Sequence, residues 1–288
     1  MIVVQLHGGL GNQMFQAAAG LALADRLGDR LMFDFSRYRT KGLRAYALGP
    51  FALDADLMPT PPAFSGAISR VLNRLKGEKE RAPGFRGVLY REPHFHVDPA
   101  FFTLSGDVQI CGYFQSAWYF AGHEDTVRAA LEPKKLASGR ALTLAEQLAG
   151  DTSVAVHVRR GDYAADPRAA GVHGTQTDAY YDRAVARVLE TVPAARFFVF
   201  SDTPAEAAAL ARRLPNAVVM AGESAGDDLF LMSCARHHVI ANSSFSWWSA
   251  WLDRRPDGIR IAPKSWFTPE AAQTRLTDDL IPRDWVQL

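Results

Sequence analysis

The sequence predicts an α/β protein of two domains, because short apolar runs alternate with amphipathic helix-length segments along most of its 288 residues. This alternation is typical of parallel sheets that helices cover on both faces. We expect the boundary between the domains near residue 150, which gives domains over residues 1–150 and 151–288. Ligands bind beyond the carboxyl ends of the strands in such sheets. The loops after the strands are therefore the places to look for a site.

The first half begins with a βαβ unit. A β-rich run over residues 2–6 ends at three glycines, an apolar periodic helix follows from Asn12 to Gly28, and residues 31–35 return to strand. Residues 60–87 break the pattern with proline, glycine and a run of charges, so they predict an irregular excursion with one short helix. Residues 107–114 form another predicted strand, a helix runs to about residue 131, and the segment 132–151 crosses between the halves.

The second half alternates more regularly. Predicted strands occupy residues 153–158, 196–201, 216–221, 237–241 and 259–263. Predicted helices lie between them at residues 177–192, 203–214, 226–236 and 244–254. If the sheet is parallel, the loops after these strands and the glycine turn of the first half line the rim of one cleft.

Composition excludes several classes of protein. Lys and Arg total 32 against 31 Asp and Glu, so the basic excess typical of nucleic-acid binding is absent. The two cysteines form no C-x-x-C pair, which argues against a disulfide scaffold or zinc site. No apolar run has the length of a membrane span, and the N-terminus has no basic region typical of a secretory signal. We therefore expect a cytoplasmic protein, with peripheral contact at the inner membrane surface left open.

Two stretches at strand ends carry the residues for anion binding. In HVRRGDY, the two arginines follow a predicted strand and point to opposite sides, so one can face the cleft while the other pairs with Asp162 or the protein body. In NSSFSWW, serines stand at a predicted helix start, the usual place for an anion. Asp202 ends another strand, where it either contacts a ligand or caps the next helix. The tryptophans are predicted to be core.

Two other patterns have competing interpretations. The GGLGNQ turn is equally suited to tight packing and to a ligand loop, and it lacks the dinucleotide spacing G-x-G-x-x-G. Asp54 and Asp56 match the D-x-D of metal-dependent sugar transferases, but we place them in a proline-flanked loop and reject a metal site there. Protease, hydrolase and P-loop motifs are absent.

Taken together, GGLGNQMFQ, HVRRGDY, FSD and NSSFSWWSAWL, in this order, resemble the bacterial α-1,2-fucosyltransferases of glycosyltransferase family 11 over nearly the whole chain. The resemblance implies a GT-B fold, with two Rossmann-like domains facing across a cleft, the first on the acceptor side and the second binding GDP-fucose. This architecture leaves open that the last residues of the chain pack back on the first domain. It also implies transfer from GDP-β-L-fucose to O2 of a terminal β-galactoside, on an oligosaccharide or a lipid-linked glycan, with inversion and without a metal or other cofactor.

The resemblance also implies roles for individual residues. Arg159 would hold the diphosphate with Arg160 in support, and Asn12 would lie near the reacting centre. The remaining donor-side candidates are His157, Asp202, Asn242, Ser243, Ser244, Phe245 and Ser246. The candidates for the acceptor or its loop are His7, Gly8, Gly9, Gly11, Asn12 and Gln13. The general base stays open among Asp162, His7 and Asp34. Competing functions are transfer of another nucleotide sugar, non-catalytic nucleotide or glycan binding, and an NAD-dependent reductase.

Overall fold

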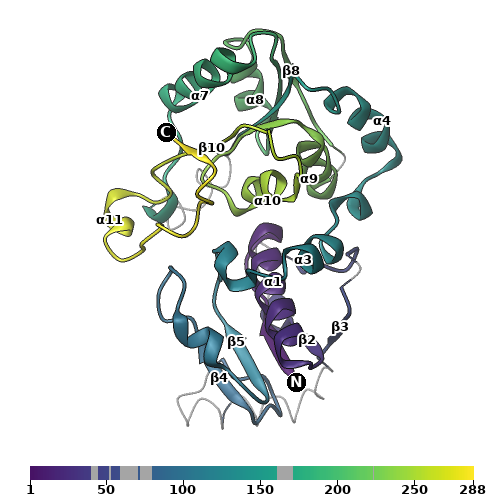
Figure 1. Cartoon of the computed structure of the whole chain (residues 1–288), viewed down its shortest axis with the longest axis vertical. Helices are drawn as coiled ribbons and strands as arrows, with labels where there is room; N and C mark the ends of the chain where they lie inside the picture. The colour runs from purple at the N-terminus through teal and green to yellow at the C-terminus, as the bar shows by residue number, and fades with distance from the viewer. Residues whose placement is uncertain (40–44, 52, 59–70, 72–79, 161–170, 223) are drawn as a thin grey trace. The chain divides into compact units, whose positions relative to one another are not determined.

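The computed structural model describes residues 1–39, 45–51, 53–58, 71, 80–160, 171–222 and 224–288 (Figure 1). The chain divides into two compact units, Met1–Leu131 and Glu132–Leu288. The units divide after Leu131, whereas the sequence predicts a boundary near residue 150. The division comes earlier because helix α4 (Gly139–Leu148) packs on helix α9 (Ala225–Cys234) and so belongs to the second unit. Among the described residues, no helix combines the length and the apolar character that crossing a bilayer requires.

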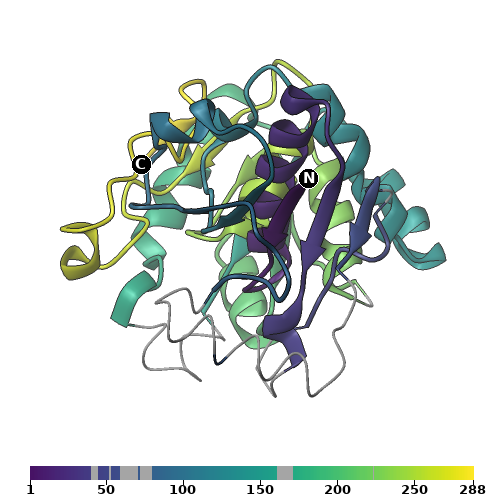
Figure 2. The same ribbon diagram turned by 90° about the horizontal axis from the view of Figure 1, so that it is seen from below.

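The first unit is a five-stranded parallel sheet in the order β3-β2-β1-β5-β4. Helix α1 packs against β1 and β2, with the helices that follow β5 beside it (Figures 1 and 2). The elements are β1 (Ile2–Gln5), α1 (Leu10–Leu27), β2 (Leu31–Asp34), η1 (Ser36–Arg39), β3 (Ala55–Leu57), β4 (Val88–Arg91), η2 (Pro99–Thr103), β5 (Val108–Cys111), η3 (Ala117–Phe120) and α3 (Glu124–Ala130).

Close packing of α1 on β1 depends on a glycine. A Cβ at Gly20 would lie 2.3 Å from Cγ2 of Val4, so only a residue without a side chain lets the helix approach the strand this closely. The helix ends as the sequence predicts, at Gly28, whose φ of 61° is left-handed. The predicted βαβ unit is therefore confirmed.

The second unit is a six-stranded parallel sheet in the order β11-β10-β9-β6-β7-β8. Helices α7 and α8 cover one face and α4 and α9 the other (Figure 1). Its elements are η4 (Pro133–Leu136), α4, β6 (Ser153–Val158), α7 (Asp178–Thr191), β7 (Arg196–Ser201), α8 (Pro204–Ala211), β8 (Ala217–Val219), α9, β9 (His237–Val239), α10 (Ser244–Leu252), β10 (Arg260–Ala262), α11 (Pro269–Ala272) and β11 (Val286–Gln287).

Most predicted elements are confirmed. The exceptions are the helices α4 and α11, which the sequence did not predict, and three strands at or near the sheet edges. Strands β3, β4 and β11 were not expected from the sequence. Asp56 lies in β3, so the loop assigned to it is wrong, although the strand is a short and mostly exposed edge. The predicted excursion over residues 60–87 lies largely outside the described residues.

Candidate functional site

The strand order of the second unit marks one position for a ligand. Counting the six strands from β6, the order reads 3-2-1-4-5-6 from β8 to β11, which is that of a Rossmann fold. The order reverses between β6 and β9, and ligands of such folds bind beyond the carboxyl ends of the strands at this point. HVRR ends β6, and NSSFS follows β9. The structure therefore brings together two of the motifs that the sequence singles out.

Arg159 and the start of α10 are joined by a hydrogen bond. Nη1 of Arg159 donates to Oγ of Ser243 at 2.9 Å. Ser243 is the N-cap residue of α10, yet its side chain makes no capping bond to the helix. A serine at this position ordinarily satisfies an N–H of the first turn. Here it orients a guanidinium instead, so a cation lies beside a helix N-terminus that the Ser243 side chain does not cap, which is a suitable arrangement for an anion.

His157 lies in β6, two residues before Arg159, and its imidazole is held neutral. Burial, and then the charge of Arg159, lower its pKa to about 3. Its Nδ1 is buried, and no described residue bonds to it. The ring lies 5.9 Å from that of Phe245 in the first turn of α10. His157 is thus a neutral, buried group that adds no positive charge to the site.

Arg160 points away from Arg159, as strand alternation predicts. Its guanidinium donates to Glu206 Oε2 at 2.7 Å and to Asp178 Oδ1 at 2.6 Å, and both carboxylates lie on helices of the same unit. Arg160 therefore fastens the end of β6 to α7 and α8. Of the two arginines, Arg159 is the one placed beside Ser243, while Asp162 lies outside the described residues.

Asn242 secures the loop before α10. Its Nδ2 donates to the backbone carbonyls of His173, Gly174 and Trp266, at 2.7, 3.3 and 3.1 Å. The loop is thereby tied both to the segment that precedes α7 and to the segment that follows β10. Trp247, one turn into the helix, donates from Nε1 to the carbonyl of Leu280 at 2.9 Å. All three tryptophans of α10 are buried, which confirms that they are core.

The remaining donor-side candidates differ in accessibility. Asp202 follows β7 and is exposed, while Ser201 accepts the N–H of Thr203 at 3.0 Å. The helix-cap alternative for Asp202 is therefore not what the structure shows. Ser244 and Phe245 are half-buried, whereas Ser246 is fully buried and its Oγ donates to the carbonyl of Ser243.

His173 was missed from the sequence. Burial, followed by the charges of Arg159 and Arg275, lowers its pKa to about 4. Its ring lies 5.3 Å from Phe267. The local sequence GVHGT contains neither a strand end nor a motif, so nothing in it indicated a position near Arg159.

In the first unit, side chains pin the glycine turn. Gly8 has a φ of +82°, and a Cβ there would meet Nδ2 of Asn12 at 2.6 Å. Nε2 of the buried Gln13 donates to the carbonyls of Gly8 and Ala45, so Gln13 is a structural clamp. Asn12 is half-buried, and its Oδ1 accepts from Nε2 of Gln115 at 2.8 Å.

Gly9 and Gly11 flank the start of α1. Gly9 is its N-cap residue with extended backbone, and Gly11 is buried within the first turn. The turn is therefore tightly packed, and it stands after a strand at the carboxyl edge of the sheet, where its role as a ligand loop stays a prediction.

His7 follows β1 and is held by Gln16. The Gln16 amide accepts the N–H of His7 through Oε1 at 3.0 Å, and its Nε2 donates to the carbonyl of Gly112 at 3.1 Å. This orientation of the amide leaves Nε2 to donate to Nδ1 of His7 at 3.2 Å. Burial, and then the charge of Arg37, lower the pKa of His7 to about 4. A ring that is weakly basic and already accepts a hydrogen bond is poorly suited to be a general base.

Asp34, the third candidate base, ends β2. Its carboxyl group is buried, and Oδ1 accepts the N–H of Ser36 at 2.9 Å. The structure thus places His7 and Asp34 at the same edge of the first sheet, and it gives neither of them the geometry of an exposed base.

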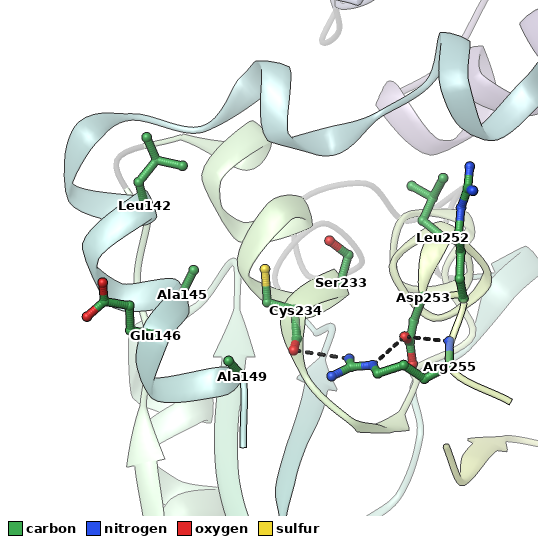
Figure 3. A pocket seen from close by; sticks show the side chains of 10 residues that line it. Leu142, Ala145, Glu146, Ala149, Ser233, Cys234, Leu252, Asp253 and Arg255 are labelled. Carbon is green, nitrogen blue, oxygen red and sulfur yellow. Dashed lines mark hydrogen bonds and ion pairs between the residues drawn. The ribbon is translucent and has the colours of Figure 1, made fainter. Parts of the chain in front are cut away.

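A pocket of about 430 Å³ lies elsewhere in the second unit, between α4, α9 and the end of α10 (Figure 3). Asp253 in its wall is buried, and its carboxylate accepts hydrogen bonds from Arg255 at 2.7 Å and from Arg260 at 3.3 Å. Asp253 and Arg255 follow the carboxyl end of α10, and Arg260 begins β10, so they lie at the opposite edge of the sheet from Arg159. Because its buried carboxylate is matched by neighbouring arginines, we interpret this pocket as structural.

Comparison with known proteins identifies the class of the fold. A solved structure of the fucosyltransferase NodZ from Bradyrhizobium matches with a TM-score of 0.52 and 15% identity, over 86% of this chain and 92% of that one. NodZ α-1,6-fucosyltransferase soaked with GDP-fucose matches over 90% of this chain and 94% of that one, with a TM-score of 0.52 and 14% identity. The α/β fold of the GT-B type is thereby confirmed.

The family is shown by sequence. The model of glycosyl transferase family 11 matches residues 101–288, and an alpha-1,2-colitosyltransferase of Escherichia coli is 31% identical over 100% of this chain and 99% of its own length. The O-antigen biosynthesis glycosyltransferase WbnK of Escherichia coli is 28% identical over 98% of this chain and 99% of its own length. This chain belongs to glycosyltransferase family 11.

Proposed function

We propose that this chain is an inverting galactoside α-1,2-L-fucosyltransferase. It would transfer fucose from GDP-β-L-fucose to O2 of a terminal β-galactoside during the synthesis of a surface polysaccharide or oligosaccharide. The observation that carries the proposal is the hydrogen bond that joins Arg159 to Ser243 at the N-terminus of α10, at the point where the Rossmann strand order reverses. Family membership supplies the reaction class.

The proposed donor site combines the guanidinium of Arg159 with the N-terminus of α10. Arg159 would hold the diphosphate, and the first turn of α10 would bind its other oxygens. Burial, and then the charge of Arg159, lower the pKa of both His157 and His173, so both imidazoles are held neutral beside this cation. Asp202, exposed at the end of β7, would accept hydrogen bonds from the guanosine.

The chemistry follows from the charge of the leaving group. As the bond between C1 of fucose and the phosphate oxygen breaks, negative charge grows on GDP and positive charge on the sugar ring. A guanidinium already fixed by Ser243 can stabilise that departing charge without reorganising. We therefore expect no cofactor and no metal requirement, with the nucleotide sugar as a substrate.

Inversion also requires that the hydroxyl at O2 of the acceptor lose its proton. The bonds and low pKa of His7 argue against that residue. Asp162 stays the candidate from the motif. The acceptor would be a galactose-terminated glycan, free or lipid-linked, reached from the cytoplasmic side of the inner membrane.

The test is the reaction itself. Purified protein is mixed with GDP-fucose and lactose, released GDP is measured, and the linkage of the product is determined by NMR. We expect fucose on O2 of the galactose, and no product with UDP-galactose or GDP-mannose as donor. Absence of transfer to any β-galactoside, with the protein folded, would contradict the proposal.

A second donor is favoured by one observation, namely the name of the 31% identical relative. Colitose is fucose without its 3-hydroxyl group, so GDP-colitose is the competing donor. A site that hydrogen-bonds the 3-hydroxyl rejects an analogue lacking it by about 10⁴-fold, whereas a site without that bond discriminates weakly. The ratio of kcat/KM for GDP-fucose and GDP-colitose therefore separates the two assignments.

A further inference from the structure

Tyr113 occupies the position in the first unit that corresponds to the donor site in the second. The strand order β3-β2-β1-β5-β4 changes direction between β1 and β5. His7 follows β1 and Tyr113 follows β5, so both stand beyond carboxyl ends where ligands bind in parallel sheets. Their ring centroids are 4.6 Å apart with an interplanar angle of 69°.

The ring of Tyr113 is exposed although its surroundings hold it firmly. The residue is 43% exposed, and it is one of few large aromatic side chains at the surface of the described residues. An edge-on contact with His7 fixes the ring without covering both of its faces. Exposed aromatic rings beside polar groups are typical of sites for amphipathic ligands, since they offer an apolar face at a small cost in conformational entropy.

The backbone beneath Tyr113 is held by Glu92. One carboxylate accepts the N–H of Tyr113 at 2.6 Å and the N–H of Phe114 at 3.1 Å. Phe114 has a left-handed backbone, with φ 53°, which a bulky residue rarely adopts. Its own ring is fully buried against Tyr90, Phe101 and Tyr119, and this packing stabilises the turn. Such backbone outliers cluster at binding and active sites.

Polar groups flank this turn on both sides. The carbonyl of Gly112 accepts from Gln16, which also holds His7. Gln115 donates to Asn12 at the start of α1. The turn over residues 112–115 is thus attached to the GGLGNQMFQ stretch by two amide side chains, and Tyr113 lies between the two attached residues in sequence.

We propose that Tyr113 is an acceptor-binding residue whose ring stacks against the terminal hexose of the glycan. A β-galactoside suits it because the axial O4 leaves C–H groups together on one face of the sugar, while its hydroxyls point to the rim. This inference deepens the proposed function and rests on it, since it assigns the galactoside to this turn. Glu92 and Phe114 are positioning residues for the ring.

Kinetics of matched variants test the assignment. We expect Tyr113→Ala to raise KM for lactose about tenfold or more, as for truncation of an aromatic anchor, with KM for GDP-fucose unchanged. Tyr113→Phe and Tyr113→Trp should retain binding, whereas Tyr113→Leu should not. The control is Trp118→Ala, which removes an aromatic ring that is 51% exposed on η3 of the same unit. Thermal unfolding confirms that each variant is folded.

A measurement of lactose binding without catalysis separates failure of the role of Tyr113 from failure of the proposed function. Saturation-transfer NMR with lactose measures sugar contact in the absence of a donor. If wild-type protein binds and fucosylates lactose while Tyr113→Ala does both equally well, the role of Tyr113 is refuted and the proposed function stands. If wild-type protein binds lactose but does not transfer fucose, and Tyr113→Ala abolishes binding, the role of Tyr113 stands and the function fails. If wild-type protein neither binds nor modifies a galactoside, both proposals fail.

Discussion

Arg159→Ala removes the cation on which the proposed donor site depends. In the transition state, the diphosphate would lose one preorganised partner, and loss of one such contact typically slows an enzyme by about 10²–10³-fold. We expect the substitution to lower kcat/KM for GDP-fucose by a factor of about 10²–10³. Arg159→Lys keeps a charge but not the two-pronged guanidinium, so its activity should be intermediate.

The same substitution should affect folding much less than activity. Arg159 is half-buried, and its hydrogen bond to Ser243, which has a charged donor, contributes about 1.5 kcal/mol to the free energy of unfolding. In a unit of this size, 1 kcal/mol lowers Tm by about 2–4 °C. The variant should therefore stay folded at the assay temperature, so unfolding cannot account for the expected loss of activity.

The assay follows GDP release at varied GDP-fucose and saturating lactose, with the Tm of each variant measured in parallel. Arg212→Ala is the matched control, because Arg212 is an exposed arginine of the same unit at the end of α8. It should behave as wild type. If folded Arg159→Ala kept wild-type turnover, the assignment of the diphosphate to this residue would be wrong.

Four further predictions concern metal, packing and pH. Excess EDTA should leave turnover unchanged, and a loss restored by Mg²⁺ or Mn²⁺ would contradict the cation role of Arg159. Gly20→Ala should destabilise the protein by about 1–3 kcal/mol in urea unfolding, because its Cβ meets Val4, while Gly139→Ala in open space should not. Asp253→Asn should lower the free energy of unfolding by about 3 kcal/mol, since it leaves the arginines around a buried carboxylate unmatched. Although burial raises the pKa of Asp253, hydrogen bonds from His238 and Arg255 lower it overall, so this stabilisation should be lost as the pH falls through the acid range. His157, with a folded pKa of about 3 below the usual 6.5, should destabilise the fold by roughly 2 kcal/mol between pH 7 and pH 5, and His157→Gln should remove that part of the fall.

The central elements of this fold could be predicted because burial imposes a pattern on their sequence. The predicted strands over residues 153–158 and 196–201 coincide with β6 and β7, which lie inside a sheet and are apolar at most of their positions. Strands β3 and β4 escaped prediction because they lie at edges. An edge strand is short and carries exposed polar residues, so it shows neither an apolar run nor clear alternation.

The candidate site could be predicted only as far as local sequence determines geometry. Strand alternation separates Arg159 from Arg160, but the partners of Arg160 lie on α7 and α8, and no local pattern names them. Tyr113 was placed inside a strand over residues 107–114, whereas β5 ends at Cys111. Gly112 was the available signal, because a glycine within a strand pattern often marks its end.

The bonds of Asn242 and Trp247 set an order of assembly for the donor site. The loop before α10 is tied to Trp266, and the helix itself to Leu280. Both partners are synthesised after α10, so a growing chain can complete the Rossmann strands β6 to β9 before the loop that would bind the diphosphate is fixed. Competence to bind the nucleotide sugar should therefore arise late during synthesis, once the segment beyond β10 has folded back. A chain ending after α10 would keep every residue of the motif but lack the bonds to Trp266 and Leu280 that help to hold it.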